Sequence, residues 1–392
     1  MFNLKQFSYI KSLQNERAWI EIDLTALAYN VRQIKSLLSP STQLMAVVKA
    51  DAYGHGAIAI ARTVLNNGAE WLAVATVFEG IELRENGIDA PILLLGAVNT
   101  KQQIRAIIQW KLEPTLCTLK QAMVFSETIK EETKNDFTLP IHLKIDTGMS
   151  RLGILWQETA QLGQFIKRLP NLKIASIYSH LANADDSDYT YTKIQNTRYQ
   201  EALANLKSVG IATPKLHIAN SAATLTDSKL HYDIVRIGLC IYGLYPALHL
   251  QNIVNLKPVL QVKAKITQIK NIKAGTEVSY GHQYIAKKNI TIAIVGIGYA
   301  DGIPRNLSNL MSVLVRGQRI PQIGNITMDQ LIIDVSQIPN LQEGETVTLI
   351  GQDNRETISV DDWANFQKTI SWEIICGFKN RLPRININSE FS

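Results

Sequence analysis

A lysine at the end of an apolar run is the residue of this chain that points most directly to chemistry. Residues 44–48 are apolar, Lys49 follows them, and a loop with two glycines comes next at residues 50–56. A buried ammonium must be neutralised, paired or used covalently, because apolar surroundings disfavour its charge. One covalent use is a Schiff base with an aldehyde cofactor. The alternative is a strand-end lysine whose ammonium reaches water on its own stem.

Other polar residues stand at the ends of later apolar runs in the same way. Each run is short, and segments with helical spacing separate the runs. If the runs are parallel strands, their carboxyl ends share one face, and these side chains converge there. The residues concerned are Lys144, Asp146 and Arg151, then His180, then Asn220 and Ser221, and finally Arg236, Gly238 and Leu239.

The last of these groups predict a phosphate site. Ser221 could cap a helix whose first N–H groups face the site, and Gly238 would allow the next backbone segment to approach closely. Each feature also has an ordinary interpretation. Asn220 and Ser221 could be a simple helix cap and Gly238 a turn residue, while Arg151 and Asp146 could form a structural pair.

Histidines near the strand ends raise the question of a metal site. His55, His180 and His217 all lie close to the end of an apolar run. Their spacing does not match that of known metal-ligand sets, so we expect no metal.

The elements that must position these residues alternate regularly. Eight apolar runs separated by helical segments predict a (β/α)8 TIM barrel, whereas a doubly wound open sheet usually has fewer strands. We expect a further helix at 24–38, and the segment 18–23 to pair elsewhere. The expected strands are 44–48, 71–75, 92–95, 114–117, 141–145, 174–178, 215–218 and 234–237, with helices at 57–65, 81–85, 103–110, 119–130 and 192–209.

The pattern changes after Pro258. Alternating strand-like runs separated by Gly, Asn and Asp turns predict a mainly-β domain. We therefore divide the chain into a cofactor-binding barrel at 1–255 and a β domain at 256–392. The expected strands are 259–269, 290–295, 312–315, 331–335 and 346–350, with one helix at 360–367.

Composition narrows the class of protein. The 392 residues carry a net charge of +6 without a Lys/Arg cluster, so we expect neither nucleic acid nor a membrane as partner. The first 18 residues lack the apolar core of a signal peptide, and no run approaches the ~20 residues of a membrane helix. Three scattered cysteines fit a reduced cytoplasm.

These motifs together resemble the alanine racemases, pyridoxal-phosphate enzymes that combine a TIM barrel with a carboxyl-terminal β domain. The resemblance covers nearly the whole chain, from residues 17–24 to residues 381–384. Its most specific part is Val-Val-Lys49-Ala-Asp-Ala-Tyr53-Gly-His-Gly, which is similar to the cofactor-lysine motif of the family. The family implies interconversion of L- and D-alanine, with D-alanine supplied for peptidoglycan.

The resemblance also implies roles for the barrel residues. Lys49 would form the Schiff base, and Arg236 would face the pyridine nitrogen. An arginine there cannot accept the ring proton, so the cofactor would be a weaker electron sink and side reactions would be suppressed. His180 would stack on the ring and pair with Arg236. Lys144 matches a lysine that the family often carries as a carbamate, and as an anion it would hold Arg151 near the substrate carboxylate. The phosphate contacts would be Tyr53, Ser221, Gly238 and Leu239.

Racemisation needs a base on each face of the α-carbon. Val-Ser-Tyr280-Gly resembles the family's catalytic tyrosine motif, and the family places that residue in the partner subunit's site. Tyr280 would then serve the L-face and Lys49 the D-face, which implies a homodimer with shared sites. Tyr299 and Met328 would lie near the substrate, and Arg305 and Asp329 near the entrance.

One residue departs from the family pattern. Trp372 stands where the family usually has a tyrosine, close to the cofactor phosphate and the substrate pocket. Substrate breadth is therefore open, and a serine or broad-specificity racemase is the first alternative. A decarboxylase of the same fold is disfavoured by Arg236, and a noncatalytic cofactor carrier by Tyr280 and the β domain.

Overall fold

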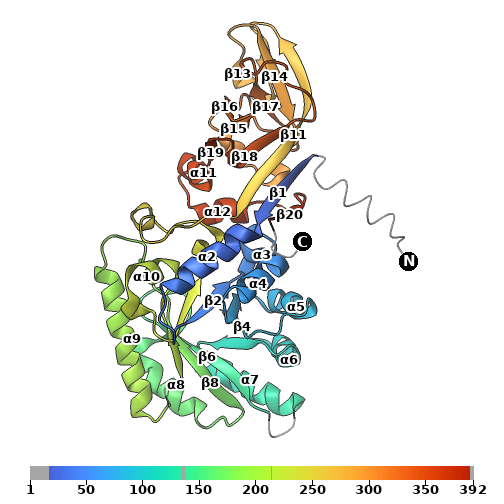
Figure 1. The fold of residues 1–392 in the computed structure, drawn as a ribbon. Coiled ribbons are helices and arrows are strands. Elements are labelled where there is room, and N and C mark those ends of the chain that lie inside the picture. The colour runs from blue at the N-terminus through green and yellow to red at the C-terminus, as the bar shows by residue number, and fades with distance from the viewer. Residues whose placement is uncertain (1–16, 134–136, 213, 389–392) are drawn as a thin grey trace. The chain divides into compact units, whose positions relative to one another are not determined.

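The computed structural model describes residues 17–133, 137–212 and 214–388 (Figure 1). Residues 1–16, where the sequence predicts no signal peptide, lie outside the described residues. Contacts divide the described chain into two units. The barrel unit consists of residues 26–52 and 57–257, and the β unit of residues 17–25, 53–56 and 258–388. None of the described helices is both long enough and apolar enough to cross a membrane.

The barrel unit contains the eight parallel strands predicted from the sequence, in the order β10-β2-β3-β4-β5-β6-β8-β9. The two ends of this path are joined as well, since Asp233 N–H donates to Leu216 O (3.0 Å) and Arg236 N–H donates to Ala219 O (3.1 Å). The TIM-barrel prediction is confirmed. The strands are β2 Gln43–Val47, β3 Trp71–Val74, β4 Ile92–Ala97, β5 Glu113–Leu116, β6 Leu139–Asp146, β8 Leu172–Tyr178, β9 Lys215–His217 and β10 Ile234–Ile237, and the short β7 Ile154–Leu155 pairs with β6.

Threonine caps begin three consecutive barrel helices. Thr76, Thr100 and Thr118 each accept a backbone N–H of the first turn on the side-chain oxygen, which satisfies a donor that has no partner within the helix. The predicted helices are confirmed, and α8 is an additional one. It was missed because Gly163 interrupts its pattern; that glycine lets α8 pack on Leu206. The helices are α2 Leu24–Ser36, α3 Lys49–Gly54, α4 Ala57–Asn66, α5 Val77–Glu85, α6 Lys101–Gln109, α7 Leu119–Glu132, α8 Thr159–Ile166, α9 Thr190–Ser208 and α10 Ser221–Thr226.

The β unit is built around the long strand β11 (Leu260–Ile272), which pairs with β1, β14 and β18. β1 (Ala18–Asp23) also pairs in parallel with β20, so the prediction that this segment pairs outside the barrel is confirmed. The sequence predicted β11, β14, β15, β17 and β18 but none of the other strands of this unit after Pro258. Of those missed, β12, β13 and β19 have only two or three residues, too few for a period to show. The remaining strands are β12 Glu277–Val278, β13 Tyr284–Ile285, β14 Ile290–Val295, β15 Ser312–Val315, β16 Gln318–Pro321, β17 Leu331–Asp334, β18 Thr346–Asp353, β19 Glu356–Ile358 and β20 Arg384–Ile387.

Two helices interrupt the β unit. α11 (Val360–Gln367) has the predicted bounds and begins with a capping box, in which Ser359 Oγ accepts the N–H of Asp362 and the Asp362 carboxylate accepts the N–H of Ser359. α12 (Ser371–Cys376) was not predicted, because six residues are too few to establish helical spacing.

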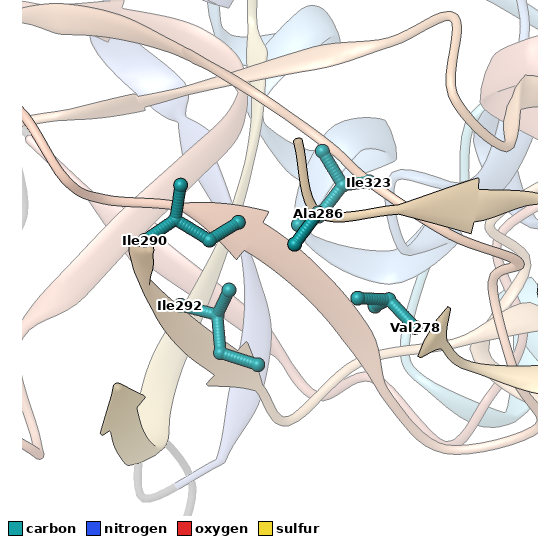
Figure 2. Close-up of a cluster of buried hydrophobic side chains, with 5 residues drawn as sticks. All are labelled: Val278, Ala286, Ile290, Ile292 and Ile323. Carbon is teal, nitrogen blue, oxygen red and sulfur yellow. The ribbon is translucent and has the colours of Figure 1, made fainter. Parts of the chain in front are cut away.

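A small apolar core supports the hairpin β12–β13. Figure 2 shows its five buried side chains. Tyr284 and Ile332 are partly buried and pack against this core. The turn of this hairpin carries Tyr280, so the core fixes the backbone on which that side chain stands. The five residues are Val278, Ala286, Ile290, Ile292 and Ile323.

Candidate active site

Lys49 begins a left-handed helical turn at the end of β2. The backbone φ angles of Ala50, Asp51, Ala52 and Tyr53 all lie between 51° and 55°, a region that costs an L-residue roughly 1–2 kcal/mol. Two carboxylates support the turn, since Asp51 Oδ1 accepts the N–H of Ala57 (2.7 Å) and Glu79 Oε1 accepts the N–H of Ala50 (2.7 Å). Strain of this kind clusters at functional sites, and here it immediately follows the lysine singled out from the sequence.

Four cationic side chains of the barrel unit gather around His180. Burial lowers the pKa of His180 well below its usual value, and the charges of Arg236, Lys144, Arg151 and Lys49 lower it further. The imidazole is therefore neutral. Arg236 is close enough to bond it, with Nη2 donating to His180 Nδ1 at 3.2 Å. The structure thus brings together five of the residues that the sequence placed at strand ends.

The same charges act on Lys144. Burial lowers its pKa to about 8, and the nearby cations Arg236, Arg151 and Lys49 contribute in the same direction. Its Nζ lies 5.3 Å from the centre of the Tyr178 ring, and Arg236 Cζ lies 5.2 Å from that centre. An amine with this pKa has an appreciable neutral fraction at pH 7 to 8, which is the form that reacts with carbon dioxide to give a carbamate.

This set of side chains fits an anionic ligand. Lys144 and Arg236 are 6% and 4% exposed, yet neither has an ion pair with a carboxylate in the described part of the chain. Buried cations that repel one another are costly unless an anion joins them. A phosphate-bearing cofactor and a substrate carboxylate would supply that charge, and the amine of Lys49 would supply the aldehyde-binding group.

The predicted phosphate end is only partly as expected. Asn220, not Ser221, caps α10: its Oδ1 accepts the N–H of Ala223 at 3.0 Å, because the cap residue precedes the first helical residue. Ser221 Oγ instead accepts the N–H of Gly238 at 3.2 Å. Ser221, Gly238 and Leu239 therefore do lie together, with Leu239 beginning the 3₁₀ turn Leu239–Tyr242.

Asp146 does not pair with Arg151. Its Oδ1 accepts the N–H groups of Gly148 (2.9 Å) and Ser150 (3.0 Å), which shapes the turn that ends at Arg151. Ser150 has a positive φ of 55° in that turn. The side chain of Arg151 is exposed. The structural-pair interpretation is therefore wrong, and Arg151 keeps its guanidinium available for a ligand.

The site residues predicted on the β unit are mostly exposed. Tyr280 is 73% exposed, Met328 54% and Tyr299 40%. Their backbones are nevertheless fixed. Asn325 Nδ2 donates to Tyr280 O (2.6 Å), and the N–H groups of Tyr299 and Ala300 donate to the carbonyls of Thr327 and Met328 (both 3.0 Å).

Gly298 makes the contact between the loops of Tyr299 and Met328 possible. A Cβ on Gly298 would lie 2.3 Å from Thr327 O and 2.5 Å from Met328 O, so only glycine allows the two loops to touch. The loops that carry Tyr299 and Met328 are therefore held side by side.

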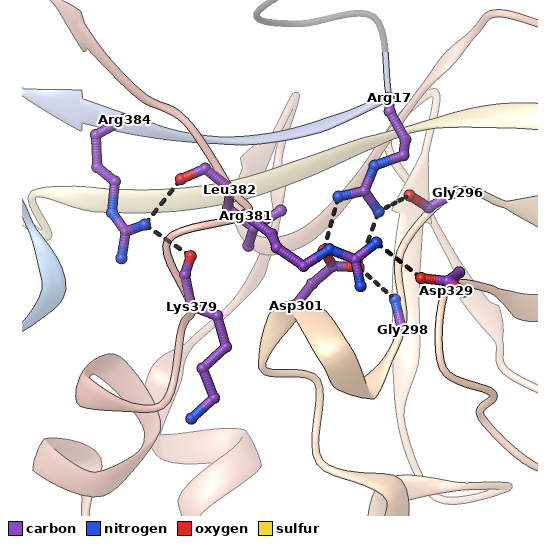
Figure 3. A network of polar contacts seen from close by, with 9 residues as sticks. All are labelled: Arg17, Gly296, Gly298, Asp301, Asp329, Lys379, Arg381, Leu382 and Arg384. Carbon is purple, nitrogen blue, oxygen red and sulfur yellow. Dashed lines mark hydrogen bonds and ion pairs between the residues drawn. The ribbon is translucent and has the colours of Figure 1, made fainter.

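A buried carboxylate anchors the same loops, as Figure 3 shows. Asp301 is fully buried and accepts two hydrogen bonds from Arg17 (2.7 and 2.9 Å) and one from Gly298 N–H (3.0 Å). Burial alone would raise its pKa, but the hydrogen bonds from Arg17 and Gly298 lower it below the usual value. Arg381 contacts Asp301 (3.6 Å) and the exposed Asp329 (2.7 Å).

The two remaining predicted residues of the β unit differ in burial. Arg305 is exposed, at the start of the 3₁₀ turn Arg305–Leu307. Trp372 is half-buried, as the second residue of α12.

α12 packs closely against residues 53–56 of the same unit. A Cβ on Gly54 would lie 2.5 Å from Ile375 O, and Arg384 Nε donates to Gly54 O (3.0 Å). Tyr53 itself is buried, which raises the pKa of its phenol. α12, the helix that carries Trp372, is thus in contact with the turn that carries Tyr53.

The sequence prediction missed the partners of Arg236 other than His180. Arg236 Nη1 donates to His217 Nδ1 (2.9 Å), and Nη2 donates to the carbonyls of Ser179 (2.7 Å) and Ile218 (3.1 Å). His217 was considered only as a metal ligand. The sequence feature that could have indicated these partners is a single polar residue inside an otherwise apolar run. His142, Ser176 and His217 all stand in such a position. The described residues contain no cluster of three or more metal-ligating side chains.

The chain is similar to known proteins along nearly its whole length. The model of the alanine racemase N-terminal domain matches residues 22–246, and that of the C-terminal domain matches residues 259–386. An alanine racemase of Nostoc sp. is 60% identical over 95% of this chain and 96% of its own, and one of Synechocystis sp. is 56% identical over 95% and 99%.

Solved structures are similar along the same length. Alanine racemase from Bacillus anthracis with bound L-Ala-P superposes with a TM-score of 0.90 at 35% identity, covering 95% of this chain and 96% of that one. A Clostridium difficile alanine racemase in complex with cycloserine gives 0.87 at 32% identity, with coverages of 95% and 96%. With both domain models matched in order and relatives at this identity along nearly its full length, the chain belongs to the alanine racemase family.

Proposed function

We propose that this protein is a pyridoxal-phosphate-dependent alanine racemase that interconverts L- and D-alanine in the cytoplasm and supplies D-alanine for peptidoglycan. The observation that carries the proposal is the group of four cations around neutral His180. A noncatalytic carrier would need the phosphate contacts but not the additional cations. A substrate carboxylate gives those cations a second anion to bind.

In this proposal the barrel residues bind and orient. When bound, the cofactor supplies an electron sink that acidifies the substrate α-proton. Lys49 holds the cofactor and acts as the base on the D-face. Ser221, with the N–H groups of Gly238 and Leu239, holds the phosphate. Arg236 keeps a donor directed at the ring nitrogen.

Arg151 and Lys144 act on the substrate side. The exposed guanidinium of Arg151 binds the carboxylate, because a planar fork of N–H donors matches its two oxygens. A carbamate on Lys144 would turn one of the crowded cations into an anion. That change would remove its repulsion from Arg151 and hold the guanidinium in place.

The second base is assigned to the β unit. Tyr280 serves the L-face, and we assign it to the site of the partner subunit, so that the protein acts as a homodimer with shared sites. Tyr299 and Met328 contact the substrate, and Arg305 and Asp329 line the entrance. The exposure of Tyr280, Met328 and Tyr299 supports the assignment, because these side chains lack cover within their own chain. Residues 1–255 then bind the cofactor and residues 256–392 supply the partner's tyrosine.

Chiral analysis tests the function directly. Purified protein with pyridoxal phosphate is incubated separately with L-alanine, L-serine, L-lysine and L-arginine, and the D-isomer of each is measured over time. We expect D-alanine to form well ahead of the others. Faster racemisation of serine would move the assignment to a serine racemase and implicate Trp372. Absence of any D-isomer, with cofactor bound, would contradict the proposal.

A further inference from the structure

A chain of hydrogen bonds runs from Arg236 to a carboxylate on the other side of the barrel unit. One residue from each of five neighbouring strands takes part, in the order β10, β9, β8, β6 and β5. Its links are Arg236 Nη1 to His217 Nδ1 (2.9 Å), His217 Nε2 to Ser176 Oγ (2.7 Å), Ser176 Oγ to His142 Nδ1 (2.6 Å) and His142 Nε2 to Glu113 Oε2 (2.8 Å).

The direction of every bond follows from the arginine end. A guanidinium only donates, so His217 Nδ1 must accept from it and carry no proton. Burial and the charge of Arg236 lower the pKa of His217 well below its usual value, so the ring is neutral and its one proton is on Nε2. That Nε2–H donates to Ser176 Oγ.

The order continues to the carboxylate. Ser176 Oγ accepts a hydrogen bond from His217 Nε2–H, so its own hydroxyl donates to His142 Nδ1. His142 then carries its proton on Nε2, and this N–H donates a hydrogen bond to Glu113. An ionised carboxylate only accepts, so this last bond also has the correct direction. In this arrangement the polar hydrogens of His217, Ser176 and His142 each lie in one hydrogen bond of the chain.

Reversing the chain would leave Nη1 of Arg236 without His217 as its acceptor. A proton on His142 Nδ1 would donate to Ser176, whose hydroxyl would then donate to His217 Nε2. His217 would carry its proton on Nδ1, facing the N–H of Arg236. Two donors would oppose each other at a residue that is 4% exposed, and neither could turn to water.

The far end of the chain also matters for charge. All four hydrogen-bond partners of Arg236 in the described structure are neutral: two ring nitrogens and two carbonyls. Burial lowers the pKa of Arg236 to about 10. Glu113 is the one anion among the five residues of this hydrogen-bond chain. It is the first residue of β5, and its side chain is 16% exposed.

We propose that Glu113 is a positioning residue for Arg236. By accepting from His142, its carboxylate selects the tautomer of each histidine, and so keeps a nitrogen of His217 ready to accept from the guanidinium. Arg236 is thereby held so that an N–H outside these bonds, on Nε or Nη1, can face the cofactor ring. This last consequence rests on the proposed function, whereas the proton order itself does not.

Nitrogen NMR of the holoenzyme tests the proton order. In protein labelled with ¹⁵N-histidine, His142 and His217 are identified by substituting each in turn. We expect both to be neutral with the proton on Nε2 and an unprotonated Nδ1. A proton on Nδ1 of His217, or two protonated nitrogens on either ring, would overturn the proposal whether or not the enzyme racemises alanine.

Breaking the chain tests its role. Ser176→Ala removes the middle link, and Ser126→Ala is the matched control, because Ser126 is equally buried but bonds Asn171 Oδ1 (2.8 Å) outside the chain. We expect Ser176→Ala to give mixed tautomers of His217, to shift the absorbance band of bound cofactor and to lower kcat about ten-fold, as for loss of one strong hydrogen bond.

A conservative change at the carboxylate completes the test. Glu113→Gln keeps an oxygen that accepts from His142 but removes the charge, whereas Glu113→Leu removes both. We expect the tautomers to survive in Glu113→Gln and to become mixed in Glu113→Leu, with the larger loss of kcat in the second. Equal spectra and turnover for wild type, Ser176→Ala and Glu113→Leu would show that the chain has only a structural role.

Discussion

The two units present their site residues in opposite ways. In the barrel unit Lys144 and Arg236 are almost completely buried, and hydrogen bonds to two ring nitrogens and two carbonyls hold Arg236. In the β unit Tyr280 is 73% exposed and its hydroxyl has no partner in the described structure; only its backbone is fixed. One set is therefore buried within the barrel unit, and the other is exposed on a fixed loop, as the proposed contribution to a partner subunit's site requires.

The difference has a physical origin. A charged group that binds an anion must have its donors aimed before the ligand arrives, and burial in a strand end provides that aim. In the proposed homodimer, the groups around the Tyr280 hydroxyl would come together only when the two subunits assemble. The pKa of a phenol near 10 must be lowered for it to act as a base, and the cations that could lower it belong to the barrel units.

The largest expected effect tests the barrel-unit side of this comparison. Lys49→Ala removes both the group that holds the cofactor and one of the two bases. We expect turnover to fall by about 10⁴-fold or more, and the absorbance of covalently held cofactor to disappear. Lys101→Ala, on the outer helix α6, is the control and should keep both. Covalent cofactor in Lys49→Ala would show that another lysine is used.

Tyr280→Phe tests the exposed side. Loss of one hydroxyl base predicts a fall in turnover of roughly 10³-fold in both directions, while cofactor absorbance stays normal. Tyr284→Phe, in strand β13 of the same hairpin, is the matched control because its ring packs on the apolar core of Figure 2. Mixing inactive Tyr280→Phe with inactive Lys49→Ala sharpens the comparison. If sites are shared, about half of the dimers in an equimolar mixture are mixed and each has one intact site, so the mixture regains up to about a quarter of the wild-type activity; unshared sites regain none.

Much of this comparison could be predicted from the sequence, since the barrel strands and the residues at their ends follow from period and position. Lys49, Lys144, His180 and Arg236 were identified in that way. The cap at Asn220 was not, because a cap and the next residue cannot be separated without the helix start. The acceptor role of His217 depends on which nitrogen faces Arg236, and such non-local contacts leave no local pattern.

Asp301, which anchors the loops that carry Tyr299 and Met328, can be substituted without changing either of these residues. Asp301→Asn removes the carboxylate that accepts two bonds from Arg17, leaving a cation facing an amide (Figure 3). We expect the free energy of unfolding to fall by about 3 kcal/mol, as for a broken buried pair. Glu356→Gln, which removes an exposed pair with Arg319, should change it little.

The pKa of Asp301 gives the sign of a pH effect. Because the folded-state pKa is lowered, the stabilisation is present above the unfolded value of about 3.9 and is lost as the pH falls below it. Denaturant melts at pH 7 and pH 3 should therefore differ less for Asp301→Asn than for wild type. An equal pH dependence would exclude Asp301 as a contributor.

The smallest expected effect is for a residue at the amino-terminal end of a barrel strand. It tests whether a residue must lie at the carboxyl end of a strand, and not merely in the barrel unit, to affect turnover. Glu70 lies at the opposite end of β2 from Lys49: it bonds Lys35 Nζ (2.5 Å) and accepts the N–H of Leu44 (2.8 Å). Glu70→Gln keeps an acceptor but loses the charge, so we expect a loss of about 1 kcal/mol in stability. Turnover per folded protein should be unchanged, because the amino-terminal face of such barrels serves stability. A several-fold fall in kcat with unchanged cofactor content would mean that charges at both ends of β2 act on the site.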